Sequence, residues 1–303
     1  MAYIVVAGGM NVDISAQPFQ RLRMKDSTPG RIRTGFGGVG RNIAHNLRLL
    51  GVEVELLTAL GGDSFAGEAE SSCKELGIGV EHMLHINNLP TSAYVYINDE
   101  HGDMFLAVSD MAICEELTPE YFASHQALLD GAALVIADTN LPTRSLVYLA
   151  ENLRVPLFVD PVSAAKAGKL SGILPKIHTL KPNSLEAEIL SGVPVVDRNS
   201  ARRAARKLIE LGVRQVFLSL GREGFLAAGE DETVWQPALP VRVRSATGAG
   251  DALMATLAWA WLRGENLSRT AALGAAAGAL AVESDSTINP NFSVETVTAR
   301  AAD

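Results

Sequence analysis

The sequence contains little cysteine and no apolar run long enough to cross a membrane. Only two cysteines, Cys73 and Cys114, occur among its 303 residues. Isolated cysteines form no metal-binding or redox motif, so reduced thiols in a cytoplasmic protein are expected. The longest apolar stretches, 252–262 and 271–282, are shorter than the roughly 20 residues that a bilayer requires. We therefore expect two buried helices there and no contact with a membrane.

Positive charge is scarce as well. The chain has 26 lysines and arginines against 34 acidic residues, which gives a net charge of −8 at pH 7. A nucleic-acid surface needs clustered basic residues, so no nucleic-acid partner is expected. The apolar run 3–7 has no basic segment before it, which favours a first strand over a signal peptide.

Short β-branched runs alternate with amphipathic helical patterns along the chain. The patterns predict strands at 3–7, 54–59, 134–137, 157–159 and 216–220, and helices at 40–50 and 201–211. Repeated strand–helix–strand units predict an α/β fold, with a mostly parallel sheet covered by helices on both sides. Ligands of such sheets bind at the carboxyl ends of the strands. The length is compatible with one domain carrying insertions or with two domains.

Two segments, 14–36 and 91–109, interrupt this alternation. The second has two apolar strands around a turn at 98–102, which is typical of a β-hairpin. We expect both segments to form antiparallel strands outside the main sheet. A small sheet beside a ligand cleft would act as a lid. Because its outer face would need covering, we expect a homodimer formed through the lid.

The most informative motif lies at 246–252, just before a predicted helix. Its small residues Gly248, Ala249 and Gly250 would let an anion approach the unpaired N–H groups of a helix start. Asp251 would repel a bound phosphate unless it has a task there, such as taking a proton from an attacking hydroxyl. The motif is thus compatible with phosphoryl transfer to an alcohol or with an ordinary turn at a helix start.

Two residue groups could bind a small polar ligand. The segment 35–42 matches G-x-G-x-x-G but does not follow the first strand, so a dinucleotide site is rejected. Its Gly38 and Asn42 are compatible with a bound polyol or with a tight strand-to-helix turn. Asn11 and Asp13 follow the first strand, where Asp13 can accept hydrogen bonds from two neighbouring hydroxyls or serve as a turn.

Two later motifs are compatible with nucleotide binding. Asn183 and Glu186 share one face of a helix start, where they could organise water around Mg²⁺ or simply cap the helix. Ser219, Gly221 and Gly224 follow a predicted strand and could admit a nucleotide or form a β-turn.

Together these motifs, in this order, resemble the ribokinase-like (PfkB) family of sugar and nucleoside kinases over the whole chain. The resemblance implies a single domain at 1–303, a three-layer α/β sandwich with a β-sheet lid, and the cofactors ATP and Mg²⁺. It implies a catalytic base at Asp251, an anion hole at Gly248, Ala249 and Gly250, Mg²⁺ and ATP phosphates at Glu186 and Asn183, a nucleotide loop at Ser219, Gly221 and Gly224, and sugar contacts at Asn11, Asp13, Gly38 and Asn42. Many members also bind K⁺, expected here at Ser245 and Thr247, although Ser245 replaces a frequent Asp.

Within the family, the segments 26–32, 37–44 and 178–188 are similar to members that act on the nucleoside pseudouridine. This implies phosphorylation of the ribose 5′-hydroxyl. Candidate base contacts are Ser27, Thr91 and Asp110, whereas Asp138 and Lys166 could face the substrate or pair with neighbours. The alternatives are a kinase for another nucleoside or a free sugar such as ribose or fructose, and a non-catalytic nucleoside sensor.

Overall fold

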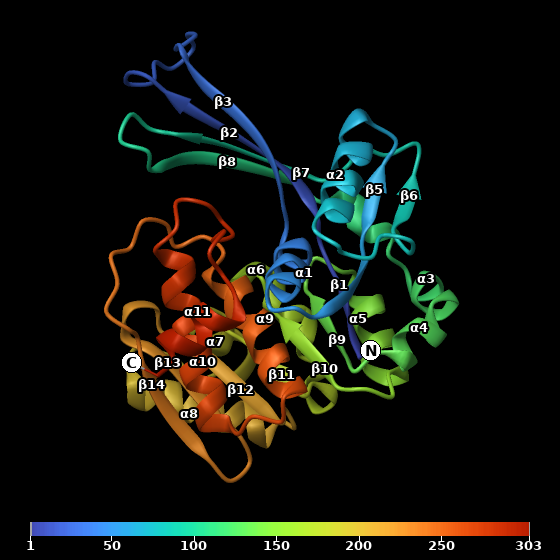
Figure 1. The fold of residues 1–303 in the computed structure, drawn as a ribbon, viewed down its shortest axis with the longest axis vertical. Coiled ribbons are helices and arrows are strands. Elements are labelled where there is room, and N and C mark those ends of the chain that lie inside the picture. The colour runs from blue at the N-terminus through green and yellow to red at the C-terminus, as the bar shows by residue number, and fades with distance from the viewer. Residues whose placement is uncertain (1, 303) are drawn as a thin grey trace.

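In the computed structural model, which describes residues 2–302, six parallel strands form the main part of an eight-stranded sheet (Figure 1). In spatial order the strands are β14 (Thr233–Pro237), β13 (Gly224–Ala228), β12 (Gln215–Ser219), β11 (Thr179–Leu180), β10 (Leu157–Asp160), β9 (Leu134–Asp138), β1 (Tyr3–Ala7) and β4 (Glu53–Leu57). The pairs from β12 to β4 are parallel, and β13 and β14 are added antiparallel. The predicted mostly parallel sheet is confirmed. One predicted strand, 54–59, divides into β4 and a short strand β5 (Ala59–Gly61), which pairs with β6 (Leu84–Ile86).

Side chains alternate between two buried cores along the central strands. In β1, Ile4 and Val6 enter one core, whereas Val5 and Ala7 enter the other. The first core is covered by α1 (Val39–Leu49), α2 (Ser64–Glu75), α9 (Ala249–Leu262), α10 (Leu267–Val282) and α11 (Val294–Arg300). The second is covered by α3 (Pro119–Ser124), α4 (Gln126–Gly131), α5 (Thr143–Asn152), α6 (Ala164–Ala167), α7 (Ser184–Ser191) and α8 (Arg198–Glu210). The result is a three-layer sandwich.

The two long apolar stretches are helices of the first layer, as expected. Helices α9 and α10 bury most of their residues against each other and the sheet. Within residues 2–302, no helix is both long and apolar enough to span a membrane.

A four-stranded sheet, the lid, projects from the main body (Figure 1). Its spatial order is β3 (Gly30–Gly37), β2 (Asn11–Pro18), β7 (Ala93–Asn98) and β8 (Met104–Asp110). Each hairpin is antiparallel as predicted, but β2 and β7 pair in parallel, so the sheet is mixed. Strand β2 also begins at Asn11 rather than near residue 14, because the chain passes almost directly from β1 into the lid.

The lid has one apolar and one polar face. Residues paired across strands share a face, and the rows Ile32–Ala16–Ile97–Leu106 and Ile14–Val95–Val108 form the apolar one. Ile32 and Val108 are 71% and 66% exposed. The polar face carries Asp13, next to the end of β1, and continues through Ser15 and Arg33. The lid therefore presents polar groups beside the carboxyl ends of the main strands and leaves its apolar face uncovered.

Candidate active site

The N-terminus of α9 is open to an anion. Gly248 precedes the helix with φ of 85°, and a Cβ at this position would lie 2.1 Å from the carbonyl oxygen of Thr287. Only glycine fits this left-handed conformation and close approach. Among the described residues, no side chain caps this helix start. The first N–H groups of α9 are therefore available to a phosphoryl group.

Asp251 lies in the first turn of α9 and contacts the start of α1. The side-chain amide of Asn42 donates a hydrogen bond of 2.9 Å to Oδ2 of Asp251, joining residues 209 positions apart. Gly38, with φ of 97°, begins α1 and places Asn42 in its first turns. Burial and the nearby Asp160 raise the pKa of Asp251 to about 7, against the opposing effects of Asn42 and Lys181. A carboxylate with a pKa near neutrality is suited to act as a general base.

The ends of α1 and α9 around Asn42 and Asp251 form what we call the Asp251 corner. The predicted sugar-binding residues lie near it. The amide of Asn11 donates to Oδ1 of Asp13 over 2.6 Å, at the start of β2. Burial raises the pKa of Asp13, while Asn11 lowers it. The Oδ1 atom of Asn42 is buried and has no protein partner among the described residues, so it can accept a hydrogen bond from a ligand hydroxyl. Asn42 thus links Asp251 to a site that can hold a polyol.

Asn183 and Glu186 form a capping box at the start of α7. The backbone N–H of Glu186 donates to Oδ1 of Asn183 (3.0 Å), and the N–H of Asn183 donates to Oε2 of Glu186 (2.8 Å). The capping alternative is therefore realised, and Glu186 is buried at the same end of the sheet as Lys181 and Asp251. Residues 2–302 hold no cluster of three metal-ligating side chains. Glu186 fits Mg²⁺ only through water, with the phosphates supplying further ligands.

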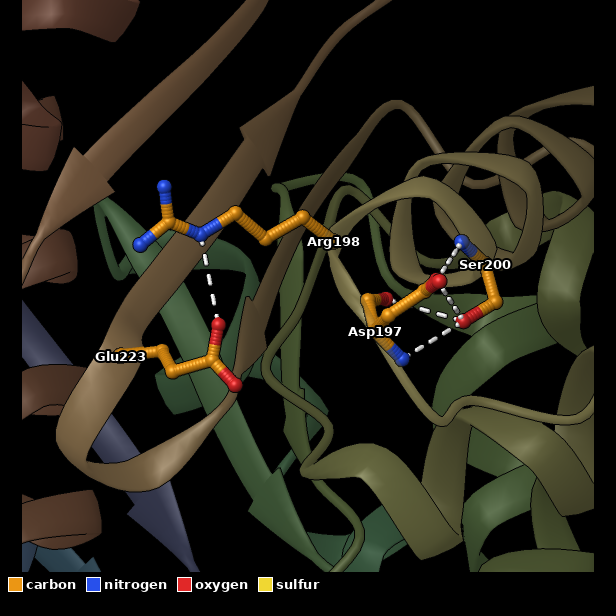
Figure 2. Close-up of polar contacts among 4 residues, drawn as sticks. All are labelled: Asp197, Arg198, Ser200 and Glu223. Carbon is orange, nitrogen blue, oxygen red and sulfur yellow. Dashed lines mark hydrogen bonds and ion pairs between the residues drawn. The ribbon is translucent and has the colours of Figure 1, made fainter.

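The predicted nucleotide loop adjoins this capping box. Ser219 bridges to Asn183, because the strands β11 and β12 end side by side. Residues Gly221–Glu223 form a short 3₁₀ helix that leads into β13. Figure 2 shows Nε of Arg198 reaching the carboxylate of Glu223 (3.3 Å) from the start of α8, where Asp197 and Ser200 form a capping box. The guanidinium of Arg198 also lies 4.2 Å above the Trp235 ring. The loop is thus tethered to α8 through Glu223, and Arg198 of α8 also contacts β14.

Comparison with known proteins identifies the family of this chain. The family model described as "pfkB family carbohydrate kinase" matches residues 1–293. The chain belongs to the pfkB family of carbohydrate kinases. It is therefore an ATP-dependent phosphotransferase acting on small molecules, and its fold is ribokinase-like.

Two curated pfkB relatives from Escherichia coli K12 are similar over nearly the whole chain. The pseudouridine kinase is 36% identical over 97% of this chain and 95% of its own length. The uncharacterized sugar kinase YeiI is 35% identical over 97% of this chain and 82% of its own. A solved Arabidopsis thaliana ribokinase, complexed with ribose and ATP, has a TM-score of 0.89 and 24% identity, and covers 99% of each chain. At that identity the ribokinase supports the shared fold alone.

Three of the proposed substrate residues are engaged with neighbours in the structure. The hydroxyl of Thr91 donates to Oδ1 of Asp63 (2.8 Å) and accepts from the N–H of Gly61 (3.0 Å). Asp138 accepts the N–H groups of Gly9 (2.9 Å) and Asn140 (2.8 Å), and Nζ of Lys166 donates to Oδ1 of Asn140 (2.5 Å). Asp138 and Lys166 thus contact neighbouring residues, and a role for them in substrate binding stays a proposal.

Four other proposed residues lie in the lid or just before α9. Ser27 is exposed in the β2–β3 connection at the end of the lid, and Asp110 is exposed at the end of β8, where it accepts the N–H of Ala112 (3.1 Å). Ser245 and Thr247 precede α9, and the N–H of Thr247 donates to Oγ of Ser245 (3.2 Å). Assignment of K⁺ to these last two residues remains a proposal.

Sequence reasoning missed two buried charges beside Asp251. Nζ of Lys181 lies 3.2 Å from Oδ2 of Asp160, and their side chains are 10% and 5% exposed. Lys181 directly follows β11, and Asp160 ends β10. For Asp160, a charged residue at the carboxyl end of the predicted strand 157–159 was the available signal, because such ends face the ligand. Lys181 follows β11, a two-residue strand that the sequence patterns did not predict.

Proposed function

We propose that this pfkB kinase transfers the γ-phosphoryl group of ATP to the ribose 5′-hydroxyl of pseudouridine, releasing ADP and pseudouridine 5′-phosphate. The observation that carries this choice is the 36% identity to the E. coli K12 pseudouridine kinase over almost the full length of both chains. The polar corner formed by Asn11, Asp13 and Asn42 supports a sugar-containing acceptor.

Asp251 acts as the general base in this proposal. Asp13 and Asn42 hold the ribose so that its 5′-hydroxyl faces the Asp251 carboxylate. Asp251 takes the hydroxyl proton as the hydroxyl oxygen forms a bond to the γ-phosphorus and the bond to the leaving ADP oxygen breaks. The proton ends on Asp251, and the negative charge of the broken bond leaves with ADP. The hydrogen bond from Asn42 supports the role by orienting the base.

The chain stabilises the transferring group mainly by position and charge. The N–H groups of Ala249 and Gly250 point from the start of α9 toward an anion placed there. The loop at Ser219, Gly221 and Gly224 contacts the nucleotide beside Asn183. When bound with ATP, Mg²⁺ neutralises phosphate charge, and Glu186 orients its water ligands. Thr247 and Ser245 supply oxygens for K⁺.

The lid covers the acceptor and forms a homodimer in this proposal. Its apolar face is exposed over Ile32, Val95 and Val108, a pattern that a second copy of the same sheet would cover. Ser27, Thr91 and Asp110 place the base beneath it. The two free cysteines are buried, which suits a cytoplasmic protein.

A kinase for another nucleoside or a free sugar is the second candidate. The 35% identity to the uncharacterized sugar kinase YeiI favours it almost as strongly. The core motifs act on the phosphoryl group and are shared by either candidate, so they do not separate the two.

An acceptor panel in an ADP-release assay tests the choice. The purified chain is given ATP, Mg²⁺ and pseudouridine, uridine, ribose or fructose in turn. We expect the highest kcat/KM with pseudouridine. No ADP with pseudouridine and steady release with a free sugar would contradict the proposed acceptor. No ADP with any acceptor would instead favour a non-catalytic sensor.

A further inference from the structure

A buried lysine occupies the centre of the proposed phosphoryl site. Lys181 and Asp160 form the ion pair described above, 3.2 Å apart, with both side chains nearly excluded from solvent. A buried pair is weak as a device for stability alone, because desolvation of both ions offsets their attraction. The surroundings of the ammonium provide a second reason for its place here.

The ammonium lies against the start of α9. A Cβ added to Gly250 would come within 3.1 Å of Nζ of Lys181, so the lysine approaches the same turn whose N–H groups face the phosphoryl group. Asp251 is the next residue, and its charge acts on Lys181. The lysine thus reaches the reacting end of the site from β11, whereas the base reaches it from α9.

The local charge balance is strongly negative without this lysine. Asp160, Glu186 and Asp251 all act on Lys181. Burial disfavours its charged form, yet these three carboxylates raise the pKa of Lys181 above its ordinary value. The lysine therefore carries a full positive charge in the place where the phosphates of ATP would add further negative charge.

A strained turn fixes the position of Asp160, the residue that pairs with Lys181. Oδ1 of Asp160 accepts the N–H of Val162 over 2.9 Å, which leaves Oδ2 for Lys181. Val162 has φ of 62°, a left-handed conformation that a β-branched residue rarely adopts. Such strain persists where the surroundings fix it, and it is concentrated at functional sites. The turn is an observation independent of the ion pair, and it fixes the orientation of Asp160.

We propose that Lys181 is a catalytic residue, whose ammonium contacts the phosphoryl group during transfer, and that Asp160 is a positioning residue that aims it. The inference rests on the proposed site of phosphoryl transfer at the start of α9, and it is independent of which acceptor is used. Lys181 remains protonated throughout: the proton of the acceptor hydroxyl goes to Asp251. The ammonium offsets the charge that develops on the transferring oxygens, a contribution made mainly in the transition state.

Three variants separate this role from a structural one. Lys181→Met removes the charge, and Lys181→Arg keeps it in another shape. The double variant Asp160→Asn/Lys181→Met removes both charges, so that no buried ion is left unpaired. Lys169→Met is the matched control, because Nζ of Lys169 donates to the carbonyl oxygens of Thr139 (2.9 Å) and Leu141 (2.8 Å).

We expect Lys181→Met to lower kcat by about 100- to 1000-fold, the usual cost of losing one such electrostatic contact, with KM for the acceptor little changed. The double variant should match the wild type in stability and the Lys181→Met variant in kcat. Lys181→Arg should recover part of the wild-type kcat. The acid limb of the pH–rate profile should move to higher pH in Lys181→Met, because Asp251 loses a neighbouring cation. Lys169→Met should leave both kcat and this profile unchanged.

A binding measurement complements the kinetics. Calorimetry with Mg²⁺, acceptor and ADP–aluminium fluoride, which imitates the transferring group, should show a large loss of affinity in the double variant. Affinity for ADP alone should stay near that of the wild type. Recovery of wild-type kcat in the double variant would overturn the proposal, as would unchanged affinity for the fluoride complex. All variants are assayed with whichever acceptor the wild type phosphorylates, so an error in the acceptor would not be mistaken for an error about Lys181.

Discussion

The corner around Asp251 and the lid are held in different ways. Around Asp251, side chains from α1, α9, β10 and the residue after β11 contact in two pairs, the Asn42–Asp251 hydrogen bond and the Lys181–Asp160 ion pair. The lid is held mainly by its own strand pairing, and every residue of β8 is exposed. The first region is built from contacts within one chain, whereas the second presents an apolar face that residues 2–302 leave exposed.

This difference separates two tasks. Phosphoryl transfer needs charges held in fixed positions, and a packed corner provides them. Acceptor selection needs a surface that opens and closes, and a sheet with few contacts to the body suits that task. We therefore expect substitutions in the corner to reduce turnover with every acceptor, and substitutions in the lid to change acceptor binding.

The largest expected effect is that of Asp251→Asn. The amide keeps the size of the side chain but cannot take the hydroxyl proton, so kcat should fall by at least ~100-fold with each acceptor that the wild type uses. Steady-state kinetics would measure this, with ATP binding followed separately as a control for folding. Turnover near that of the wild type would show that Asp251 is not the general base. The Asp251 corner would then not differ from the lid in its effect on kcat.

A lid substitution should have a smaller and different effect. The double variant Ile32→Lys/Val108→Lys places two charges on the exposed apolar face, so it should convert a dimer to a monomer. It should also raise KM for the acceptor about tenfold, which corresponds to a loss of ~1.4 kcal/mol in the free energy of closing the lid over the acceptor. The value of kcat should stay within about threefold of the wild type, because the corner is intact. Light scattering after gel filtration and steady-state kinetics would measure both. Met24→Lys, at an exposed position beyond the lid strands, is the control. A wild type that is already monomeric would contradict the dimer.

The same contrast governs what the sequence could predict. The alternation of strands and helices predicted the parallel sheet, and this is confirmed, because local residue types determine it. The glycines and the acid at 248–251 predicted a helix start without a side-chain cap, and the anion site placed there stays a prediction. The parallel pairing of β2 with β7 was missed, because it joins two hairpins through tertiary contacts that no local pattern encodes. Lys181 was missed for the same reason: its importance depends on Asp160 and Gly250, which reach it from other elements.

Thermal stability should depend on pH in the corner. The pKa of Asp251 is about 7 in the folded protein against an ordinary 3.8, so its contribution to stability is fully present below pH 3.8 and is lost as the pH rises through 7. Asp251→Asn removes this titration. The Tm of the variant relative to the wild type should therefore be higher at pH 8 than at pH 5, by about 5–10 °C. A folded-state pKa of about 7 costs the wild type ~2–3 kcal/mol between these pH values, and ~1 kcal/mol shifts Tm by about 2–4 °C in a large domain.

Calorimetric scans at the two pH values would measure this difference. Asp103→Asn, at an exposed position in the lid, is the control and should give the same Tm difference at both. A Tm difference for Asp251→Asn that does not vary with pH would show that ionisation of Asp251 does not destabilise the folded protein.

The smallest expected effect belongs to the tether of the nucleotide loop. The side chains of Arg198 and Glu223 are 57% and 54% exposed, and such pairs are worth ~0–1 kcal/mol. Arg198→Ala should raise KM for ATP by about twofold to threefold without changing kcat, because it loosens the loop and leaves the corner intact. Initial rates at varied ATP would measure this. A large fall in kcat would mean that the loop is coupled to the catalytic corner.

The central claim is that the Asp251 corner transfers a phosphoryl group to the 5′-oxygen of pseudouridine. The most direct test is ³¹P and ¹H NMR of the product formed from ATP and pseudouridine, with ADP measured in the same sample. We predict pseudouridine 5′-phosphate in a one-to-one ratio with ADP for the wild type, and no product above background for Asp251→Asn. Phosphate on another oxygen, or ADP released without a phosphorylated nucleoside, would contradict the claim.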